Sequence, residues 1–175
     1  MVIWVTGLSG SGKTTLCNAL WEQLKPALPE LVILDGDAVR AVLGGGLGYR
    51  EQDRVVQIKR IQNMAKMLSD QGLTVLVAAL YASPELLCWN RENIDDYFEV
   101  YLEASLDTLK SRDRKGLYGD TGSGAVTNVV GVDIKWHIPE APDIKFKTDG
   151  PEAPSVLAER VISTIPRLRE AQRVP

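Results

Sequence analysis

Short apolar runs alternate along the chain with longer segments in which apolar residues recur every three or four positions. Short apolar runs between turn residues are typical of buried strands, and the longer repeat is typical of a helix with one buried face. The pattern predicts strands over residues 2–6, 31–34, 73–80, 98–102 and 144–148. It predicts helices over residues 14–25, 53–73, 84–97, 105–114 and 155–172. This alternation indicates an α/β fold, a five-stranded parallel sheet flanked by helices.

Two glycine-rich segments interrupt the alternation, residues 44–49 (GGGLGY) and residues 116–132. The second is long for a loop inside a compact domain, which favours a mobile functional element such as a lid. Because basic residues lie where it begins, we expect the lid to cover residues 112–132 of a single domain that spans residues 1–175. We also expect four large apolar residues to pack in the core: Trp4 and Trp21 because of their core-like positions, and Met64 and Met67 because of their helical spacing.

The composition is that of an ordinary globular protein, and the formal net charge of −3 gives no general reason to bind nucleic acid or an anionic membrane. Cys17 and Cys88 are the only cysteines and form no ligand-like pair, so neither a disulfide scaffold nor a zinc site is expected. The apolar run before Gly7 is too short for a signal peptide or a membrane span. We therefore expect a cytoplasmic protein with reduced thiols.

The strongest chemical signal is a complete G-x-x-x-x-G-K-[ST] motif between the first predicted strand and the first predicted helix. Its glycines let backbone N–H groups converge on phosphate oxygens, and the helix N-terminus adds partial positive charge. Lys13 supplies a full charge to the β- and γ-phosphates, and the hydroxyl of Thr14 is a ligand for Mg²⁺. The alternative is a glycine-rich turn that binds nothing. We expect ATP to bind this segment: Gly7, Leu8, Ser9, Gly10, Ser11, Gly12, Lys13, Thr14 and Thr15.

Two carboxylates, Asp35 and Asp37, follow the second predicted strand. They should emerge at the carboxyl edge of the sheet, where open α/β sheets bind ligands. Phosphoryl transfer to a hydroxyl uses one carboxylate to orient or deprotonate the hydroxyl and another to hold Mg²⁺. We assign Asp37 to the acceptor hydroxyl and Asp35 to the metal. The plainer interpretation is a turn with Asp37 as the N-cap of the next helix, which is compatible with catalysis.

Six motifs in order along nearly the whole chain resemble the adenylyl-sulfate kinase family. They are GLSGSGKTT at 7–15, LDGDAVR at 34–40, LGY with Asp53-Arg54 at 47–54, Ser83-Pro84, FEVYL at 98–102 and RDRKGLY at 112–118. The resemblance implies a P-loop kinase that phosphorylates the ribose 3′-hydroxyl of adenylyl sulfate in sulfate assimilation. It also implies a homodimer.

The resemblance assigns further side chains to the two substrates. Arg40 joins Asp35 and Asp37 on the acceptor side, and Arg54 grips the acceptor nucleotide. Tyr49 stacks on the acceptor base, and Ser83 lines the acceptor pocket. In the RDRKGLY segment, Arg112 lies near ATP and Lys115 near the transferred charge, and both Gly116 and Leu117 face the acceptor. From helical spacing alone, an isolated arginine more often belongs to a solvated face.

The chain departs from the family pattern at several positions, all on the acceptor side. Trp89 replaces an arginine, Gln57 an asparagine and Val129 a base-stacking phenylalanine, while Thr121-Gly122 and Trp136-His137 replace a basic pair and a tyrosine–glutamate pair. We still expect Gln57 and Val129 to contact the acceptor. The losses weaken the assignment of a sulfate-bearing acceptor. The alternative is neutral drift in a loop.

A branch of the family linked to surface-polysaccharide modification has similar W-N-R-E-N and V-V-G-V-D-I segments and includes cytidine diphosphoramidate kinase. That acceptor is the chief alternative. A P-loop kinase for an unrelated small molecule also fits the phosphate motif, as does a regulator that binds ATP without transferring phosphate. An ATPase assay with and without candidate acceptors separates the regulator from a kinase.

Overall fold

The structure, a computed structural model, describes residues 1–113, 116–118 and 127–172. The described chain forms a five-stranded parallel sheet with the strand order β2-β3-β1-β4-β5. Its strands are β1 (Val2–Thr6), β2 (Leu31–Asp35), β3 (Thr74–Ala79), β4 (Tyr97–Glu103) and β5 (Ile144–Lys147). Each strand coincides with a predicted apolar run to within one residue at either end, so the predicted sheet is confirmed.

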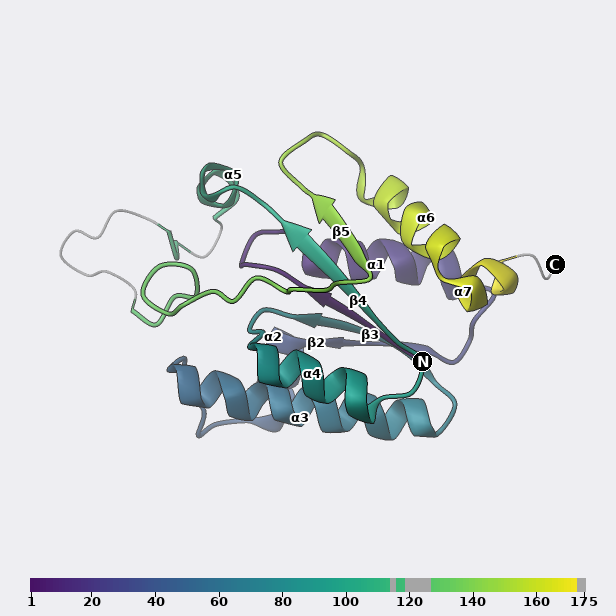
Figure 1. The fold of residues 1–175 in the computed structure, drawn as a ribbon, viewed down its shortest axis with the longest axis horizontal. Helices are drawn as coiled ribbons and strands as arrows, with labels where there is room; N and C mark the ends of the chain where they lie inside the picture. Colours follow the sequence, from purple (N-terminus) through teal and green to yellow (C-terminus); the bar gives the residue numbers. More distant parts are fainter. Residues whose placement is uncertain (114–115, 119–126, 173–175) are drawn as a thin grey trace.

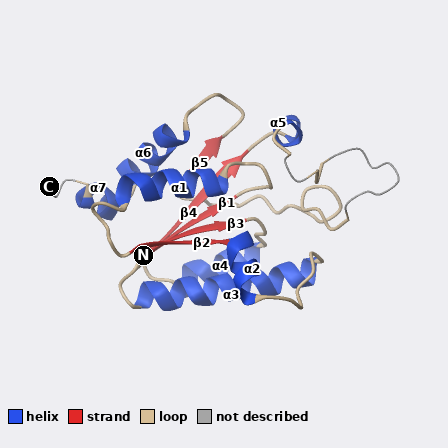
Figure 2. Cartoon of the chain, turned by 180° about the vertical axis from the view of Figure 1, so that it is seen from behind, coloured by secondary structure: helices blue, strands red, loops and turns tan. Residues whose placement is uncertain are grey.

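Helices cover both faces of the sheet (Figures 1 and 2). On one face lie α1 (Lys13–Leu24), α6 (Pro154–Thr164) and α7 (Pro166–Ala171). On the other lie α2 (Gly36–Leu43), α3 (Glu51–Asp70) and α4 (Pro84–Asn93). The short helix α5 (Leu106–Ser111) follows β4 at the end of the sheet where the strands finish.

Strand β1 shows how the alternation of side chains divides the core between the two faces. Ile3 and Val5 belong to the cluster that includes α1 and α6, whereas Val2 and Trp4 belong to the cluster that includes α3 and α4. All residues of β1 are buried. Because a parallel sheet covered on both faces leaves no strand surface for water, its central strand is apolar up to its last residue, Thr6.

The parallel register brings the ends of the central strands to one edge. Thr6 at the end of β1 pairs with Ala79 of β3 and Tyr101 of β4, and Asp35 at the end of β2 pairs with Ala78. The arrowheads in Figure 1 point to this edge, on the left of the view. The segments that follow β1 and β2 therefore emerge close together, at the edge where α/β sheets bind ligands.

The closing helix differs from its prediction. The periodicity predicts one helix over residues 155–172, whereas the structure has two, α6 and α7, separated at Ile165 by an extended backbone conformation. Pro166 explains the break, because proline has no amide hydrogen and its ring clashes with the carbonyl group four residues earlier. The proline instead takes the first position of α7, where an amide hydrogen is not needed.

Two of the four residues predicted to pack in the core lie at the surface. Trp4 is fully buried and Met64 packs against the core, but Trp21 is 39% exposed and Met67 is 55% exposed. Met67 falls outside the apolar stripe of α3, whose buried members are spaced three and four residues apart: Ile58, Ile61 and Ala65. The local pattern of apolar residues was therefore too weak a guide to the burial of Trp21 and Met67.

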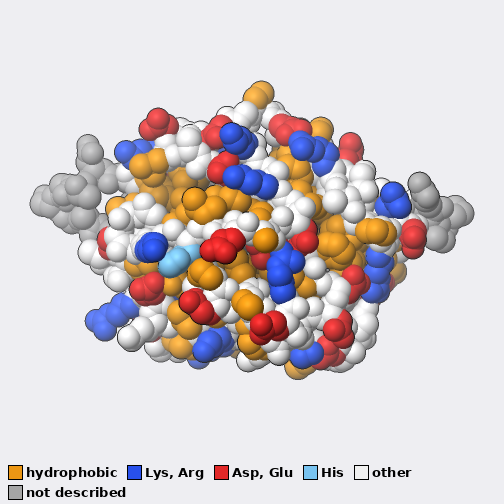
Figure 3. Space-filling model, in the orientation of Figure 1, with side chains coloured by type: hydrophobic (Ala, Val, Ile, Leu, Met, Phe, Trp, Pro, Cys, Tyr) orange, Lys and Arg blue, Asp and Glu red, His pale blue; other side chains and the backbone are white. Residues whose placement is uncertain are grey.

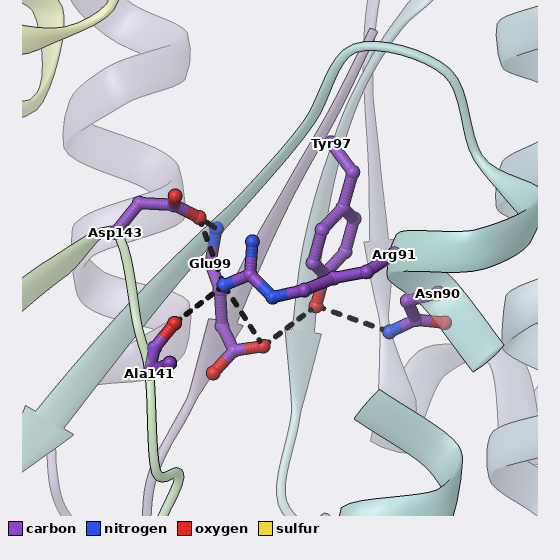
Figure 4. Close-up of polar contacts among 6 residues, drawn as sticks. All are labelled: Asn90, Arg91, Tyr97, Glu99, Ala141 and Asp143. Atoms are coloured by element: carbon purple, nitrogen blue, oxygen red, sulfur yellow. Dashed lines mark hydrogen bonds and ion pairs between the residues drawn. The ribbon is translucent and has the colours of Figure 1, made fainter. Parts of the chain in front are cut away.

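A partly buried polar network joins α4, β4 and the segment before β5 (Figure 4). The side chain of Glu99 is 2% exposed, lies 3.7 Å from the guanidinium of Arg91 and accepts a hydrogen bond from the hydroxyl of Tyr97 at 3.1 Å. Asp143 accepts hydrogen bonds from Arg91 at 3.1 Å and from the main-chain N–H of Glu99 at 2.7 Å. Burial raises the pKa of Glu99 above its ordinary value, because the charged form loses its hydration.

The surface carries charges of both signs. Figure 3 shows acidic and basic side chains interspersed with apolar ones over one face of the molecule. Among the described residues, no helix combines the length and the apolar character that a membrane crossing requires.

Candidate active site

A large cavity lies at the edge of the sheet where the strands end. Its volume is about 1150 Å³, above the roughly 300–1,000 Å³ that is usual for a small-molecule site. Its walls come from the segments that follow β1, β2, β3 and β5, represented by Lys13, Asp37, Tyr81 and Thr148. The cavity therefore has room for two substrates side by side.

The glycine-rich loop of residues 7–14 connects β1 to α1 and forms one end of this cavity. Residues 9–15 line the cavity, and residues 7–8 connect them to the end of β1 at Thr6. Gly7 has φ +152°, and a Cβ atom there would lie 2.5 Å from the carbonyl oxygen of Leu102 and 2.6 Å from the hydroxyl oxygen of Ser11. Only glycine lets the loop pass this close to β4, so the first glycine of the motif is required by packing.

Lys13 begins α1 and folds its side chain back over the loop. Its Nζ donates a hydrogen bond to the carbonyl oxygen of Leu8 at 2.8 Å, and the N–H of Ser11 donates to the same oxygen at 3.1 Å. The ammonium group thus lies above the loop on the wall of the cavity. At that place it can meet a phosphate group held by the loop and by the N-terminus of α1.

Thr14 and Asp35, the two residues assigned to Mg²⁺, are in contact. The Thr14 hydroxyl donates to Oδ2 of Asp35 at 2.7 Å, which connects the first turn of α1 to the end of β2. Hydroxyl and carboxylate oxygens are ligands that suit Mg²⁺. Among the described residues, no group of three or more histidine, cysteine, aspartate or glutamate side chains could hold a metal ion. The pair fits a Mg²⁺ ion that takes its other ligands from phosphate and water, as is usual for this ion.

Asp35 is also the N-cap of α2. Its Oδ1 accepts hydrogen bonds from the N–H groups of Asp37 at 2.9 Å and Ala38 at 3.3 Å. The sequence predicts Asp37 as this cap, and that prediction is wrong because α2 begins at Gly36, directly after β2. Asp37 instead lies in the first turn of α2 and lines the cavity.

Arg40, Tyr49 and Arg54 form a cluster on the wall of the cavity. The guanidinium groups of Arg40 and Arg54 lie 4.9 Å and 5.7 Å from the centre of the Tyr49 ring. Arg40 donates to the carbonyl oxygens of Leu47 and Gly48 at 3.2 Å and 2.8 Å. These two acceptors are neutral carbonyl groups, and Arg40 itself lines the cavity.

Arg54 is held from two sides of the site. It donates to the carbonyl oxygen of Tyr49 at 3.0 Å and to that of Asn128 at 2.6 Å. Burial and, after it, the charge of Arg40 lower the pKa of Arg54. Two neighbouring cations that repel each other next to a cavity favour an anionic ligand, because its charge relieves the repulsion.

Gln57 and Ser83, both predicted to contact the acceptor, differ in position. Gln57 lines the cavity with 4% of its surface exposed, and its Nε2 donates to the carbonyl oxygen of Gly36 at 3.3 Å. Ser83 is the N-cap of α4, where its hydroxyl accepts the N–H of Leu86 at 3.4 Å. Ser83 is absent from the described residues that line the cavity.

The predicted lid segment is described only in part. Arg112 lines the cavity and donates to the carbonyl oxygen of Thr148 at 2.8 Å. Leu117 and Val129 also line the cavity, whereas Gly116 is absent from its described walls. Lys115, with the rest of residues 114–115 and 119–126, lies outside the described residues.

Val129, which stands where the family pattern has a base-stacking phenylalanine, is buried in an apolar cluster. Its side chain is 4% exposed and packs with Leu109 and Tyr118 in a small apolar cluster, against which Leu8 and Leu117 also pack. The departure from the family pattern at this position therefore fills a local core. Tyr49, which also lines the cavity, is 57% exposed and presents an accessible aromatic ring.

The family model for adenylylsulphate kinase matches residues 1–147. The chain belongs to the adenylylsulphate kinase family. This confirms the predicted family, the P-loop kinase fold and the prediction of an ATP-dependent kinase.

Similar proteins carry the names of two different acceptors. The kinase is 42% identical over 140 residues to cytidine diphosphoramidate kinase of Campylobacter jejuni, covering 80% of this chain and 82% of that protein. It is 39% identical over 149 residues to adenylyl-sulfate kinase of Picosynechococcus, covering 85% and 84%. The solved APS kinase CysC of Mycobacterium tuberculosis, in complex with AMPPNP and APS, is 31% identical with a TM-score of 0.83, covering 93% and 95%. Family membership alone therefore does not select the acceptor.

Two features of this kinase site were missed by sequence reasoning. Tyr81 lines the cavity and donates to Glu51 at 2.6 Å, while burial and that hydrogen bond raise its pKa. The turn after β5, with Thr148, Gly150 and Pro151, lines the end of the cavity near Arg112. Both follow strand ends at the ligand-binding edge, which is the signal that could have found them.

Proposed function

We propose that this kinase transfers the γ-phosphoryl group of ATP to the ribose 3′-hydroxyl of a nucleotide, with adenylyl sulfate as acceptor and 3′-phosphoadenylyl sulfate and ADP as products. The observation that carries the proposal is one cavity that contains both the phosphate loop and the Arg40–Tyr49–Arg54 cluster, with Asp37 among its lining residues. A transfer between two nucleotides requires this combination, a triphosphate site next to a second anionic site with a carboxylate at the point of transfer.

The donor half of the mechanism rests on residues 7–15 and Arg112. Backbone N–H groups of the loop bind the phosphates of ATP, and Lys13 offsets the negative charge of the transferring group. Thr14 and Asp35 would hold Mg²⁺, which neutralises charge on the phosphates when it is bound. Arg112 lies at the cavity end formed by the turn after β5, and we assign it to the nucleotide of ATP.

The acceptor half rests on Asp37 and the arginine cluster. Asp37 orients the 3′-hydroxyl and accepts its proton as the new P–O bond forms, a role for which its place on the cavity wall is suitable. Arg40 and Arg54 bind the anionic part of the acceptor, and the exposed ring of Tyr49 stacks on its base. Stacking of a base on one aromatic ring contributes on the order of 1–3 kcal/mol.

A second candidate acceptor is cytidine diphosphoramidate, which would place the kinase in surface-polysaccharide modification rather than sulfate assimilation. The 42% identity with the Campylobacter jejuni enzyme supports it. The burial of Val129 supports it as well, because the acceptor base meets one aromatic face where the family pattern provides two.

A coupled kinase assay tests the proposal and separates the candidates. It compares adenylyl sulfate, cytidine diphosphoramidate and plain nucleoside diphosphates with the wild type and with Asp37→Asn. We expect one of the first two acceptors to dominate and the variant to lose about 100-fold or more in turnover. Equal, weak turnover of all acceptors would reject the acceptor site. Near-normal turnover by the variant would remove Asp37 from the mechanism.

Three further expectations stay predictions. They are the lid over residues 112–132 with Lys115 near the transferred charge, a single domain over residues 1–175, and a homodimer in the cytoplasm. Light scattering on the purified protein measures its mass in solution, and Lys115→Ala in the coupled assay tests the lid residue.

A further inference from the structure

Tyr118 connects the segment after α5 to the phosphate loop. Its hydroxyl donates to the carbonyl oxygen of Ser9 at 3.1 Å, across 109 positions of the chain. The side chain is 7% exposed and packs with Leu109 and Val129. Burial, with the nearby charge of Asp113, raises the pKa of Tyr118 to about 12, so the hydroxyl stays protonated and can donate at neutral pH.

The same cluster of Leu109, Tyr118 and Val129 also packs against the phosphate loop, residues 7–14. Leu8, which precedes Ser9, packs against the cluster of Leu109, Tyr118 and Val129. A Cβ atom at Gly131 would lie 3.0 Å from Cδ2 of Leu8, so the chain at Gly131 also lies close against it. The apolar contacts place the loop, but they cannot set the rotation of an individual peptide unit. A directed hydrogen bond can.

The geometry of the peptide bond gives this hydrogen bond a consequence. The carbonyl group of Ser9 and the N–H group of Gly10 belong to one planar trans peptide unit, so they point in opposite directions. Holding the carbonyl toward Tyr118 therefore aims the N–H of Gly10 away from Tyr118. Gly10 lines the cavity and has φ +82°. Because glycine adopts positive and negative φ values about equally, its own backbone preference does not fix the orientation of this peptide unit.

We propose that Tyr118 is a positioning residue for the phosphate loop: its hydroxyl fixes the Ser9 carbonyl group so that the Gly10 N–H donates to a phosphate oxygen of ATP. The proposal rests on the proposed role of residues 7–14 as the ATP phosphate site. Without the hydroxyl, the peptide unit between Ser9 and Gly10 samples other rotations. The Gly10 N–H then points toward the phosphate oxygen for a smaller fraction of the time, which weakens ATP binding.

The test compares Tyr118→Phe with a matched control, Tyr97→Phe. Both variants remove one hydroxyl from a largely buried tyrosine, but Tyr97 belongs to the network around Glu99 and is absent from the described walls of the cavity. The measurements are the affinity for a non-hydrolysable ATP analogue with Mg²⁺ by calorimetry, the KM for ATP, the KM for the acceptor, and the melting temperature.

We expect Tyr118→Phe to weaken binding of the analogue and raise the KM for ATP by about two- to tenfold, the range for one hydrogen bond. The KM for the acceptor should change less than the KM for ATP, and Tyr97→Phe should lower the melting temperature without changing analogue affinity. The proposal is overturned if Tyr118→Phe binds the analogue as tightly as the wild type. A wild type that binds the analogue but phosphorylates no nucleotide would refute the proposed function alone, because the binding comparison needs no acceptor.

Discussion

Replacing Asp35 by asparagine should separate the two contacts that this side chain makes. Its Oδ1 caps α2 through the N–H groups of Asp37 and Ala38, and its Oδ2 accepts the hydroxyl of Thr14 at 2.7 Å. Asparagine keeps an oxygen for the cap, but it places a neutral NH₂ group toward Thr14. That NH₂ group is a hydrogen-bond donor and cannot bind a cation. The variant therefore retains the helix cap and loses the proposed Mg²⁺ ligand.

The magnitudes follow from these contacts. Asparagine and aspartate are almost equal N-caps, so we expect the free energy of unfolding to change by no more than about 0.5 kcal/mol in Asp35→Asn. Asp35→Ala removes the cap as well and should cost about 1 kcal/mol, or roughly 2–4 °C in melting temperature for a chain of this size. Both variants lose charge stabilisation at the phosphates, which should lower kcat by about 100-fold or more.

The assay is steady-state phosphoryl transfer at saturating ATP over a range of Mg²⁺ concentrations, combined with denaturant unfolding of the same preparations. The expected result is two variants with similarly low kcat and different stability. An Asp35→Asn enzyme within about threefold of wild-type kcat would refute the metal assignment, since that change is well below 1 kcal/mol of barrier. A large loss of stability in the same variant would refute the account of the cap.

Three further predictions concern packing and pH. Glu99→Gln should become more stable relative to the wild type as pH rises from the ordinary glutamate pKa through the raised pKa of folded Glu99, because the folded wild type must bury the charge. Each unit of pKa difference between the folded and unfolded states contributes about 1.4 kcal/mol. Denaturant unfolding of both proteins at several pH values measures this difference in stability. The same difference in unfolding free energy between variant and wild type at every pH would contradict this prediction. Gly7→Ala should cost on the order of 3 kcal/mol because its Cβ would lie 2.5 Å from a carbonyl oxygen, whereas Gly45→Ala, with open space around its Cβ, should be nearly neutral in the same unfolding assay. Val129→Phe should destabilise the fold by about 1–3 kcal/mol without improving the KM for the acceptor, because the position is already filled; a lower KM would show that the ring reaches the base.

The sheet and the place of the glycine-rich motif at the cavity were the parts that the sequence could predict. A covered parallel strand such as β1 is apolar from Val2 to Val5, so it is visible in the sequence as a run, and the motif at residues 7–14 is contiguous. The helices were less well defined, since the apolar period continues across residue 166 and only the backbone chemistry of Pro166 divides α6 from α7. The N-cap of α2 was misplaced for a similar reason, because β2 is followed by the helix without an intervening turn.

The acceptor side depends on contacts between distant segments, which no local pattern contains. Ser83 was placed in the pocket by resemblance, yet its hydroxyl caps α4. Tyr81, two residues earlier, lines the cavity and is held there by Glu51. Residues two positions apart in sequence meet different surroundings after a strand ends, so only the fold could show which of them lines the cavity.

Two adjacent residues, Asn128 and Val129, connect the proposed acceptor and donor halves of the site. The carbonyl group of Asn128 accepts a hydrogen bond from Arg54 on the acceptor side, and Val129 packs with Tyr118, whose hydroxyl holds the phosphate loop at Ser9. Asp133 accepts hydrogen bonds from the N–H groups of both, which fixes them as one unit. If an anionic acceptor draws Arg54 away from Asn128, the restraint on this unit changes, and with it the support of the phosphate loop. Any such effect must be reciprocal, so ATP would alter acceptor affinity by the same factor as the acceptor alters ATP affinity.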